Sequence, residues 1–102
     1  MSTVIVRYRT KPERADENQR LVEKVFAELA ARRPEGFRYV TFRLDDGNSF
    51  LHIAAEEPAD DTIPLTEVAA FQAFLRDIAD RCEEQPVPTG ATVVGSYRVF
   101  AD

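Results

Sequence analysis

The sequence predicts an α+β fold in which strands and helices follow one another in the order βαββαβ. Three observations carry this prediction. Two runs of alternating, β-favouring residues flank Asp46-Gly47, a dipeptide typical of hairpin turns. Two longer segments repeat apolar residues at helical spacing. A short strand-like segment stands near each end of the chain.

The first strand is expected from Val4 to Arg9, ended by the Lys11-Pro12 break. The first helix is expected from Asp16 to Arg33, because Asp16 can cap it and a glutamine stands three residues later, as in a capping box. Its apolar residues recur at i, i+3, i+4 and i+7, and they are Leu21, Val22, Val25, Phe26, Leu29 and Ala30.

The hairpin is expected within the stretch from Glu35 to Glu56. A turn at Asp46-Gly47 sets the register and places Thr41 opposite His52. Because successive side chains of a strand point to opposite faces, two sets arise. The apolar set, which we expect to be the core face, is Val40, Phe42, Leu44, Leu51 and Ile53. The mixed set on the opposite face is Tyr39, Thr41, Arg43, Phe50, His52 and Ala54.

The second half repeats the pattern of helix and strand. Residues 57–64 are polar and rich in proline, which is typical of a loop. A second helix is expected from Thr66 to Glu84, then an extended connector at 86–90, and a last strand from Thr92 to Phe100.

This order of elements is the split βαβ, or ferredoxin-like, plan. Right-handed crossovers would place both helices on one face of a four-stranded antiparallel sheet. The first and third strands are then central, which puts His52 near the middle of the sheet. The 102 residues suffice for one domain with one core.

Two helices cover one face only, so the other face predicts a partner. On the apolar pattern this face carries Ile5, Tyr39, Phe50, Val94 and Phe100 among Arg7, Arg9, Arg43 and Arg98. A bare surface of this kind is large for a monomer. We therefore expect a homodimer packed sheet against sheet, with an interface on the order of 1,600 Å².

Charge and composition exclude several classes of function. The net charge is −5, from 18 acidic and 13 basic side chains, and such a surface repels nucleic acids and anionic membranes. No apolar run approaches the ~18 residues of a membrane span, and the N-terminus does not resemble a secretory signal. We expect a cytoplasmic protein. Cys82 is the only cysteine and is expected to be a packed, unreactive thiol.

Four places in the chain resemble the dimeric α/β-barrel proteins, in particular the antibiotic-biosynthesis-monooxygenase-like branch. They are the opening strand with Lys11-Pro12, the Pro34-Glu35-Gly36-Phe37 segment followed by Tyr39 and Phe42, the hairpin, and Phe71-Gln72-Ala73-Phe74. The resemblance covers nearly the whole chain and implies the ferredoxin-like fold described above.

The resemblance implies a mixed set of activities. Some members oxidise polycyclic phenols or quinols without a cofactor, others degrade haem, and others cyclise or isomerise small molecules. The oxidising and haem-degrading branches typically use Trp and Asn in their pockets, and this chain has no Trp. Its second helix region also lacks the His of the haem-degrading branch, which argues against haem degradation.

His52 is the only histidine and the strongest candidate for acid–base chemistry. Its face also holds Tyr39, Arg43 and Arg7, so an imidazole beside a phenol and a guanidinium would deprotonate an enol or phenol and hold the oxyanion. The competing interpretation is a structural histidine in a sheet–sheet interface.

The family's pocket location implies a second arrangement. If the pocket lies between sheet and helices, Tyr8, Tyr97 and Phe42 line it and His52 belongs to the interface. Tyrosines in such positions are more often core residues whose hydroxyls reach the surface, and this is the competing interpretation of Tyr8 and Tyr97. The sequence leaves both arrangements open.

The sequence supports no metal site, because one histidine with scattered carboxylates is a poor ligand set. No phosphate loop or dinucleotide fingerprint occurs, and no cofactor is expected. Two functions follow. The first is a monooxygenase-like enzyme acting on a hydroxylated aromatic or quinol. The alternative is a non-catalytic dimeric module that binds a small ligand or only itself.

Overall fold

The computed structural model describes residues 2–56 and 65–99. Their order confirms the α+β prediction. The elements are β1 (Ser2–Thr10), η1 (Pro12–Arg14), α1 (Ala15–Arg32), β2 (Phe37–Arg43), β3 (Ser49–Glu56), η2 (Leu65–Glu67), α2 (Ala69–Leu75), α3 (Ile78–Arg81) and β4 (Cys82–Ala91). The expected loop at 57–64 and the expected strand residue Phe100 lie outside the described residues.

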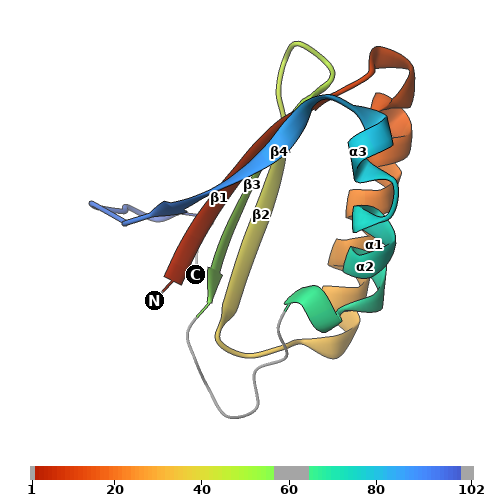
Figure 1. Cartoon of the computed structure of the whole chain (residues 1–102). Helices are drawn as coiled ribbons and strands as arrows, with labels where there is room; N and C mark the ends of the chain where they lie inside the picture. The colour runs from red at the N-terminus through yellow and green to blue at the C-terminus, as the bar shows by residue number, and fades with distance from the viewer. Residues whose placement is uncertain (1, 57–64, 100–102) are drawn as a thin grey trace.

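The four strands form one antiparallel sheet in the order β2-β3-β1-β4. The helices all stand on one side of this sheet, and the other side is bare (Figure 1). This is the ferredoxin-like plan, with β1 and β3 central, and His52 lies in the central strand β3.

The hairpin has the predicted register, with Thr41 opposite His52. Its connection is wider than a two-residue turn, because the Leu44 N–H donates to the Ser49 carbonyl at 2.8 Å. Gly47 adopts a φ of 91°, which favours glycine. The Asp46 carboxylate accepts from the backbone N–H groups of Asn48 and Ser49, so it holds the loop closed.

The start of α1 differs slightly from the prediction. The helix begins at Ala15, its N-cap is Arg14, and no side chain caps it. Asp16 therefore lies in the first turn, where a carboxylate is still favourable near the positive end of the helix dipole.

The expectation of one long second helix from Thr66 to Glu84 is wrong. The helix is broken into α2 and α3 at Arg76 and Asp77, and Asp77 adopts a left-handed φ of 65°. The buried Arg81 guanidinium donates to the carbonyls of Phe74 and Arg76 at 2.6 and 3.0 Å. These bonds satisfy carbonyls that the break leaves without helical partners.

The expected last strand at Thr92–Phe100 is also wrong, because the strand that pairs with β1 is Cys82–Ala91. This strand contains Pro86 and Pro88, which are typical of a connector. The two prolines are tolerated because β4 is an edge strand with one neighbour, so a residue without an N–H need not interrupt the hydrogen bonds between strands. The segment after β4 runs away from the sheet (Figure 1), and Val94 is fully exposed.

The hairpin faces are the reverse of the expected ones. Antiparallel partners share a face, so Phe50 lies beside Tyr8, and both are buried against the helices at 1% and 2% exposure. Phe42, expected in the core, points to the bare side and is 38% exposed. The mixed set of side chains therefore faces the helices, and the apolar set faces outward.

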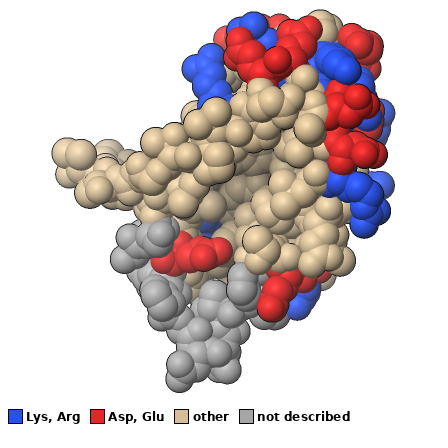
Figure 2. Space-filling model, viewed as in Figure 1, with Lys and Arg blue, Asp and Glu red and all other residues tan. Residues whose placement is uncertain are grey.

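Charged side chains are unevenly distributed over the surface. Figure 2 shows many of them over the helices and at one end of the molecule, whereas residues of other types form most of the rim of the hollow between the sheet and the helices. Among the described residues, no helix is long and apolar enough to cross a membrane.

Candidate functional site

A continuous chain of polar side chains crosses the layer between helices and sheet. We call it the polar chain, and its members are Arg81, Asn18, Tyr8, His52, Tyr39 and Thr41. Arg81 comes from α3, Asn18 from α1, and the others from the three strands β1, β3 and β2. No buried side-chain nitrogen or oxygen of the described residues lacks a hydrogen-bond partner. Each buried polar atom of the polar chain therefore has at least one partner within the protein, as buried polar groups generally do.

The first half of the polar chain starts at a buried cation. Arg81 is 1% exposed, and its Nε–H donates to Asn18 Oδ1 at 3.1 Å. Asn18 Nδ2 donates in turn to Tyr8 Oη at 2.8 Å. Asn18 is also fully buried, so these two bonds fix the orientation of its amide.

The second half is centred on His52, which is 5% exposed. Its Nε2 lies 2.8 Å from Tyr8 Oη. Its Nδ1 lies 2.5 Å from Tyr39 Oη and 3.0 Å from Thr41 Oγ1. Both ring nitrogens are therefore held by hydroxyl groups, and the imidazole cannot turn without breaking bonds.

Burial keeps the centre of the polar chain neutral. It lowers the pKa of His52 to about 4, because the imidazolium form loses its hydration and finds no carboxylate partner. It also raises the pKa of Tyr39 to about 12 and raises the pKa of Tyr8 further. At neutral pH the group is a neutral imidazole between neutral phenols.

Aromatic rings enclose this neutral group. The Tyr8 and Tyr39 rings lie against His52 with centroids 5.3 and 5.7 Å apart, and Phe74 lies 5.4 Å from it. On the far side, Phe26 stacks on Tyr39 at 4.9 Å. Flat surfaces thus continue from the centre of the sheet to the end of α1.

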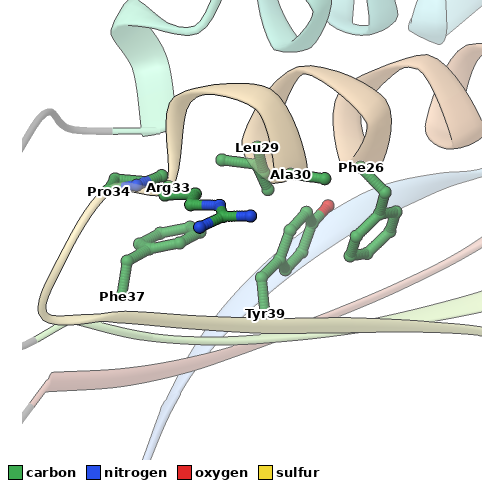
Figure 3. A pocket seen from close by; sticks show the side chains of 7 residues that line it. All are labelled: Phe26, Leu29, Ala30, Arg33, Pro34, Phe37 and Tyr39. Atoms are coloured by element: carbon green, nitrogen blue, oxygen red, sulfur yellow. The ribbon is translucent and has the colours of Figure 1, made fainter.

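A pocket of about 300 Å³ opens at the Tyr39 end of the polar chain. Figure 3 shows the Tyr39 ring as one wall, with its hydroxyl pointing toward α1, and the Arg33 guanidinium extending toward it. Arg33 follows the last residue of α1 with a left-handed φ of 49°. The lining consists mainly of apolar and aromatic side chains: Phe26, Leu29, Ala30, Arg33, Pro34, Phe37 and Tyr39.

This lining suits a flat aromatic ligand with one acidic oxygen. Small-molecule sites typically combine apolar walls with a few polar groups and have volumes of roughly 300–1,000 Å³. Here the polar groups are the Tyr39 hydroxyl and the Arg33 guanidinium, and no ion pair joins Arg33 to another described residue.

The structure brings three of the predicted site residues together: His52, Tyr39 and Tyr8. The expectation that His52 lies away from the helices is wrong, because His52 and Tyr8 share the covered face. Arg43 lies on this face but at the hairpin end, where it donates to Asp16 at 3.0 Å and Gln19 at 2.7 Å. It ties the hairpin to α1 and does not reach the pocket lining.

Three further predicted residues lie elsewhere. Arg7 is opposite Leu51 on the bare face, with its side chain exposed, and Phe42 lies on the same face. Tyr97 is 80% exposed beyond the end of β4, beside the Arg98 guanidinium. None of the three contacts the polar chain within the described part of the structure.

Sequence reasoning missed Asn18, Arg81 and Arg33. A signal existed for the first two. Asn18 stands four residues before Val22, on the buried stripe of α1, and Arg81 stands seven residues after Phe74. A polar residue on a buried stripe must find a partner. No sequence signal placed Arg33 over a pocket, because its position depends on the left-handed end of α1.

Other site types find no support in the described residues. No three metal-ligating side chains are grouped there. Cys82 is buried, and burial raises the pKa of its thiol, which opposes thiolate formation.

The fold is similar to that of solved proteins. Rv0793 from Mycobacterium tuberculosis has a TM-score of 0.72 at 12% identity, covering 93% of this chain and 96% of its own. An antibiotic biosynthesis monooxygenase has a TM-score of 0.70 at 18% identity, covering 93% and 100%. SnoaB from Streptomyces nogalater, a cofactor-independent oxygenase solved as a mutant, has a TM-score of 0.66 at 18% identity, covering 93% and 94%.

This chain has the fold of these proteins. The resemblance seen in the sequence is thereby confirmed at the level of the fold. No protein-family profile matches the sequence, and no curated protein matches it. Identities this low carry the fold and not the reaction.

Proposed function

We propose that the protein binds a flat, hydroxylated aromatic compound or quinol in the pocket between α1 and β2 and acts on it as a monooxygenase-like enzyme. One observation carries the proposal: Tyr39 forms a wall of the pocket, and its hydroxyl is hydrogen-bonded to the buried, neutral His52. The shared fold with SnoaB, which is a cofactor-independent oxygenase, supports the same reaction class.

In this proposal Tyr39 is the residue that meets the ligand. The ring of the ligand packs among Phe26, Phe37 and Tyr39. The oxygen of the ligand accepts hydrogen bonds from the Tyr39 hydroxyl and the Arg33 guanidinium. His52 does not touch the ligand but positions the Tyr39 hydroxyl by a hydrogen bond, and Tyr8 positions His52 in the same way. Such donors stabilise an oxygen that becomes negative as the ligand loses its proton.

The reaction would consume dioxygen. A phenol with a free position opposite its hydroxyl reacts with one molecule of dioxygen to give the para-quinone and one molecule of water. One oxygen atom becomes the new carbonyl and the other leaves in the water, so the substrate supplies every electron.

The non-catalytic alternative has its own supporting observation. Both nitrogens of His52 already have protein partners, as they would in a purely structural network. In this alternative the pocket binds a ligand, or remains without one, and no reaction follows.

A binding screen followed by oxygen uptake separates these functions. Hydroxylated naphthalenes, anthracenes and their quinols are screened by thermal shift. A ligand at 100 times its Kd stabilises the fold by about 2.7 kcal/mol and raises the Tm by several degrees. Binding with oxygen uptake supports the enzyme, and binding without uptake supports the binding module. No shift across the panel contradicts the enzyme and the ligand-binding module, and supports a module that binds only itself.

Matched variants test the pocket. Tyr39→Phe removes the hydroxyl and should lower the oxygen-uptake rate about 100-fold, whereas Tyr97→Phe, far from the site, should leave it unchanged. Arg33→Gln should weaken binding of a ligand with an acidic oxygen about tenfold. Arg32→Gln removes a neighbouring cation that pairs with Glu28 and should not.

We also propose that the protein is a homodimer through the bare face of the sheet. The described residues place six large apolar side chains there: Ile5, Val40, Phe42, Leu51, Ile53 and Val87. A second copy packed on this face would bury on the order of 1,600 Å², the size of a stable interface. The exposed segment after β4 adds apolar surface, with Tyr97 80% and Val93 59% exposed.

The same substitution on two faces tests the dimer. Leu51→Lys puts a charge in the centre of the bare face and should reduce the mass in solution to that of one protomer. Leu75→Lys puts the same charge on α2, where Leu75 is 44% exposed, and should leave twice the protomer mass. Light scattering gives both masses, and a monomeric unsubstituted protein at micromolar concentration would contradict the proposal.

A further inference from the structure

We infer that Arg81 and Asn18 are positioning residues that hold His52 as the tautomer protonated at Nδ1, so that the polar chain ends in a hydroxyl donor and the pocket takes its ligand as an oxyanion. The ligand half of this inference rests on the proposed function. The tautomer half rests only on the hydrogen bonds.

The direction of the polar chain is set at Arg81. A guanidinium only donates hydrogen bonds. Its Nε–H meets Asn18 Oδ1 at 3.1 Å, and its other nitrogens donate to the carbonyls of Phe74 and Arg76. The Asn18 oxygen must therefore face Arg81, and the Asn18 NH₂ group must face Tyr8.

Tyr8 passes this direction to His52. The Tyr8 hydroxyl is buried and has two polar partners, Asn18 Nδ2 and His52 Nε2, each at 2.8 Å. Because the amide already donates to the Tyr8 oxygen, the Tyr8 hydrogen must go to His52 Nε2. Nε2 is then the acceptor nitrogen, and in a neutral imidazole the proton lies on Nδ1.

The opposite direction leaves a group unsatisfied. With the proton on Nε2, the Tyr8 oxygen would face an N–H from Asn18 and another from His52, and its own hydrogen would have no acceptor. A buried hydroxyl hydrogen without an acceptor is disfavoured, because the group has given up its hydrogen bond to water and gained none in return. The tautomer protonated at Nδ1 should therefore dominate by about tenfold or more.

At the pocket end the polar chain has a hydrogen to spare. Nδ1–H points to the hydroxyls of Tyr39 and Thr41, which lie 2.5 and 3.0 Å away. Nδ1 accepts nothing, so one hydroxyl hydrogen must point outside the trio. Tyr39 lines the pocket and Thr41 does not, so the Tyr39 hydroxyl hydrogen is the one that can reach a ligand oxygen.

The direction of the hydrogen bonds in the polar chain therefore favours a ligand that has already lost its proton. His52 offers no lone pair toward the pocket, because its only one is occupied by Tyr8. The polar chain carries donors in sequence from a buried cation to the pocket wall. A phenolate or enolate oxygen accepts from such a chain, whereas a neutral phenol would compete with it for the same role of donor.

The tautomer can be read directly because His52 is the only histidine. Nitrogen-15 NMR of the uniformly labelled protein at neutral pH should show one protonated nitrogen at Nδ1 and one unprotonated nitrogen at Nε2. Finding the proton on Nε2 would overturn the inference, whatever ligands the protein binds.

Asn18→Asp should reverse the polar chain. A carboxylate accepts from both Arg81 and Tyr8, so Tyr8 Oη becomes an acceptor for His52 Nε2–H and Nδ1 loses its proton. The nitrogen assignments should exchange in this variant. Gln19→Glu adds the same charge one residue along α1, outside the polar chain, and should leave them unchanged. Equal spectra for Asn18→Asp and the unsubstituted protein would also overturn the inference.

A nitrophenol, whose phenolate absorbs visible light, tests the ligand half. Bound to the unsubstituted protein, its pKa should fall by about one unit or more, a tenfold preference for the phenolate. In Asn18→Asp the fall should disappear, and in Gln19→Glu it should persist. A raised nitrophenol pKa in the unsubstituted protein would overturn the ligand half. Failure of every phenol to bind would count against the proposed function and leave the tautomer result standing.

Discussion

The two faces of the sheet carry different kinds of side chain. The face under the helices holds a histidine, two tyrosines and a threonine joined by hydrogen bonds, and it carries the pocket at its edge. The bare face holds Ile5, Val40, Leu51 and Ile53 in neighbouring positions of three strands. Within the hairpin, the covered face is thus the more polar of the two.

This contrast limits how far a binary pattern can be trusted. Alternation tells which side chains share a face, but the face covered within one chain need not be the more apolar one. A face that holds a site keeps polar groups, whereas the bare face is mainly apolar although it carries the exposed Arg7. The same kind of substitution on the two faces should therefore change the free energy of unfolding by different amounts.

The largest difference is expected between two arginines. Arg81→Met removes the donor for Asn18 and for the carbonyls of Phe74 and Arg76, so the free energy of unfolding should fall by about 3 kcal/mol. Arg7→Met, at an exposed position of the bare face, should change it by less than about 0.5 kcal/mol. Urea unfolding at one fixed protein concentration measures both. Equal losses would remove the distinction between the faces.

The next effect is a dependence of the free energy of unfolding on pH, which arises from His52 on the covered face. His52 has a folded-state pKa of about 4 and an unfolded value of about 6.5, so the unfolded chain binds a proton that the folded chain does not. Its stabilising contribution is complete above pH 6.5 and is lost as the pH falls toward 4, by on the order of 3 kcal/mol.

The variant His52→Gln isolates this contribution, since the amide keeps a donor and an acceptor but does not titrate. Between pH 7 and pH 4 the variant should lose less stability than the unsubstituted protein, by up to that amount. Parallel pH profiles would show that the buried imidazole is not the source.

The smallest effect concerns single hydroxyl groups. Tyr8→Phe leaves Asn18 and His52 without their shared partner and should cost about 1–2 kcal/mol. Tyr97→Phe removes a hydroxyl that is exposed to water and should cost nothing measurable. Thermal unfolding of the two variants makes the comparison, and a neutral Tyr8→Phe would show that the polar chain contributes little to stability.

Much of the fold follows from the sequence. Helical spacing located α1, and the Asp46-Gly47 turn set the register of β2 and β3. The last strand was missed because its two prolines look like a connector, and only its edge position makes them acceptable.

The site was half visible. His52 and Tyr39 stood out by chemical type, but their location depended on which face the helices cover. That choice is made by long-range packing of Tyr8 and Phe50 against α1 and α2, which no local pattern encodes. The break between α2 and α3 at Asp77 allows the Arg81 side chain to point into the core. No glycine or proline stands at this break, so the sequence does not predict it.

The absence of tryptophan has an optical consequence. The chain has three tyrosines, two of which, Tyr8 and Tyr39, belong to the polar chain, while Tyr97 is exposed. In a Tyr97→Phe background, all intrinsic tyrosine emission would come from the two phenols that flank His52. Two intrinsic fluorophores thus lie at or near the proposed pocket, so ligand binding could be followed by tyrosine fluorescence without an external label.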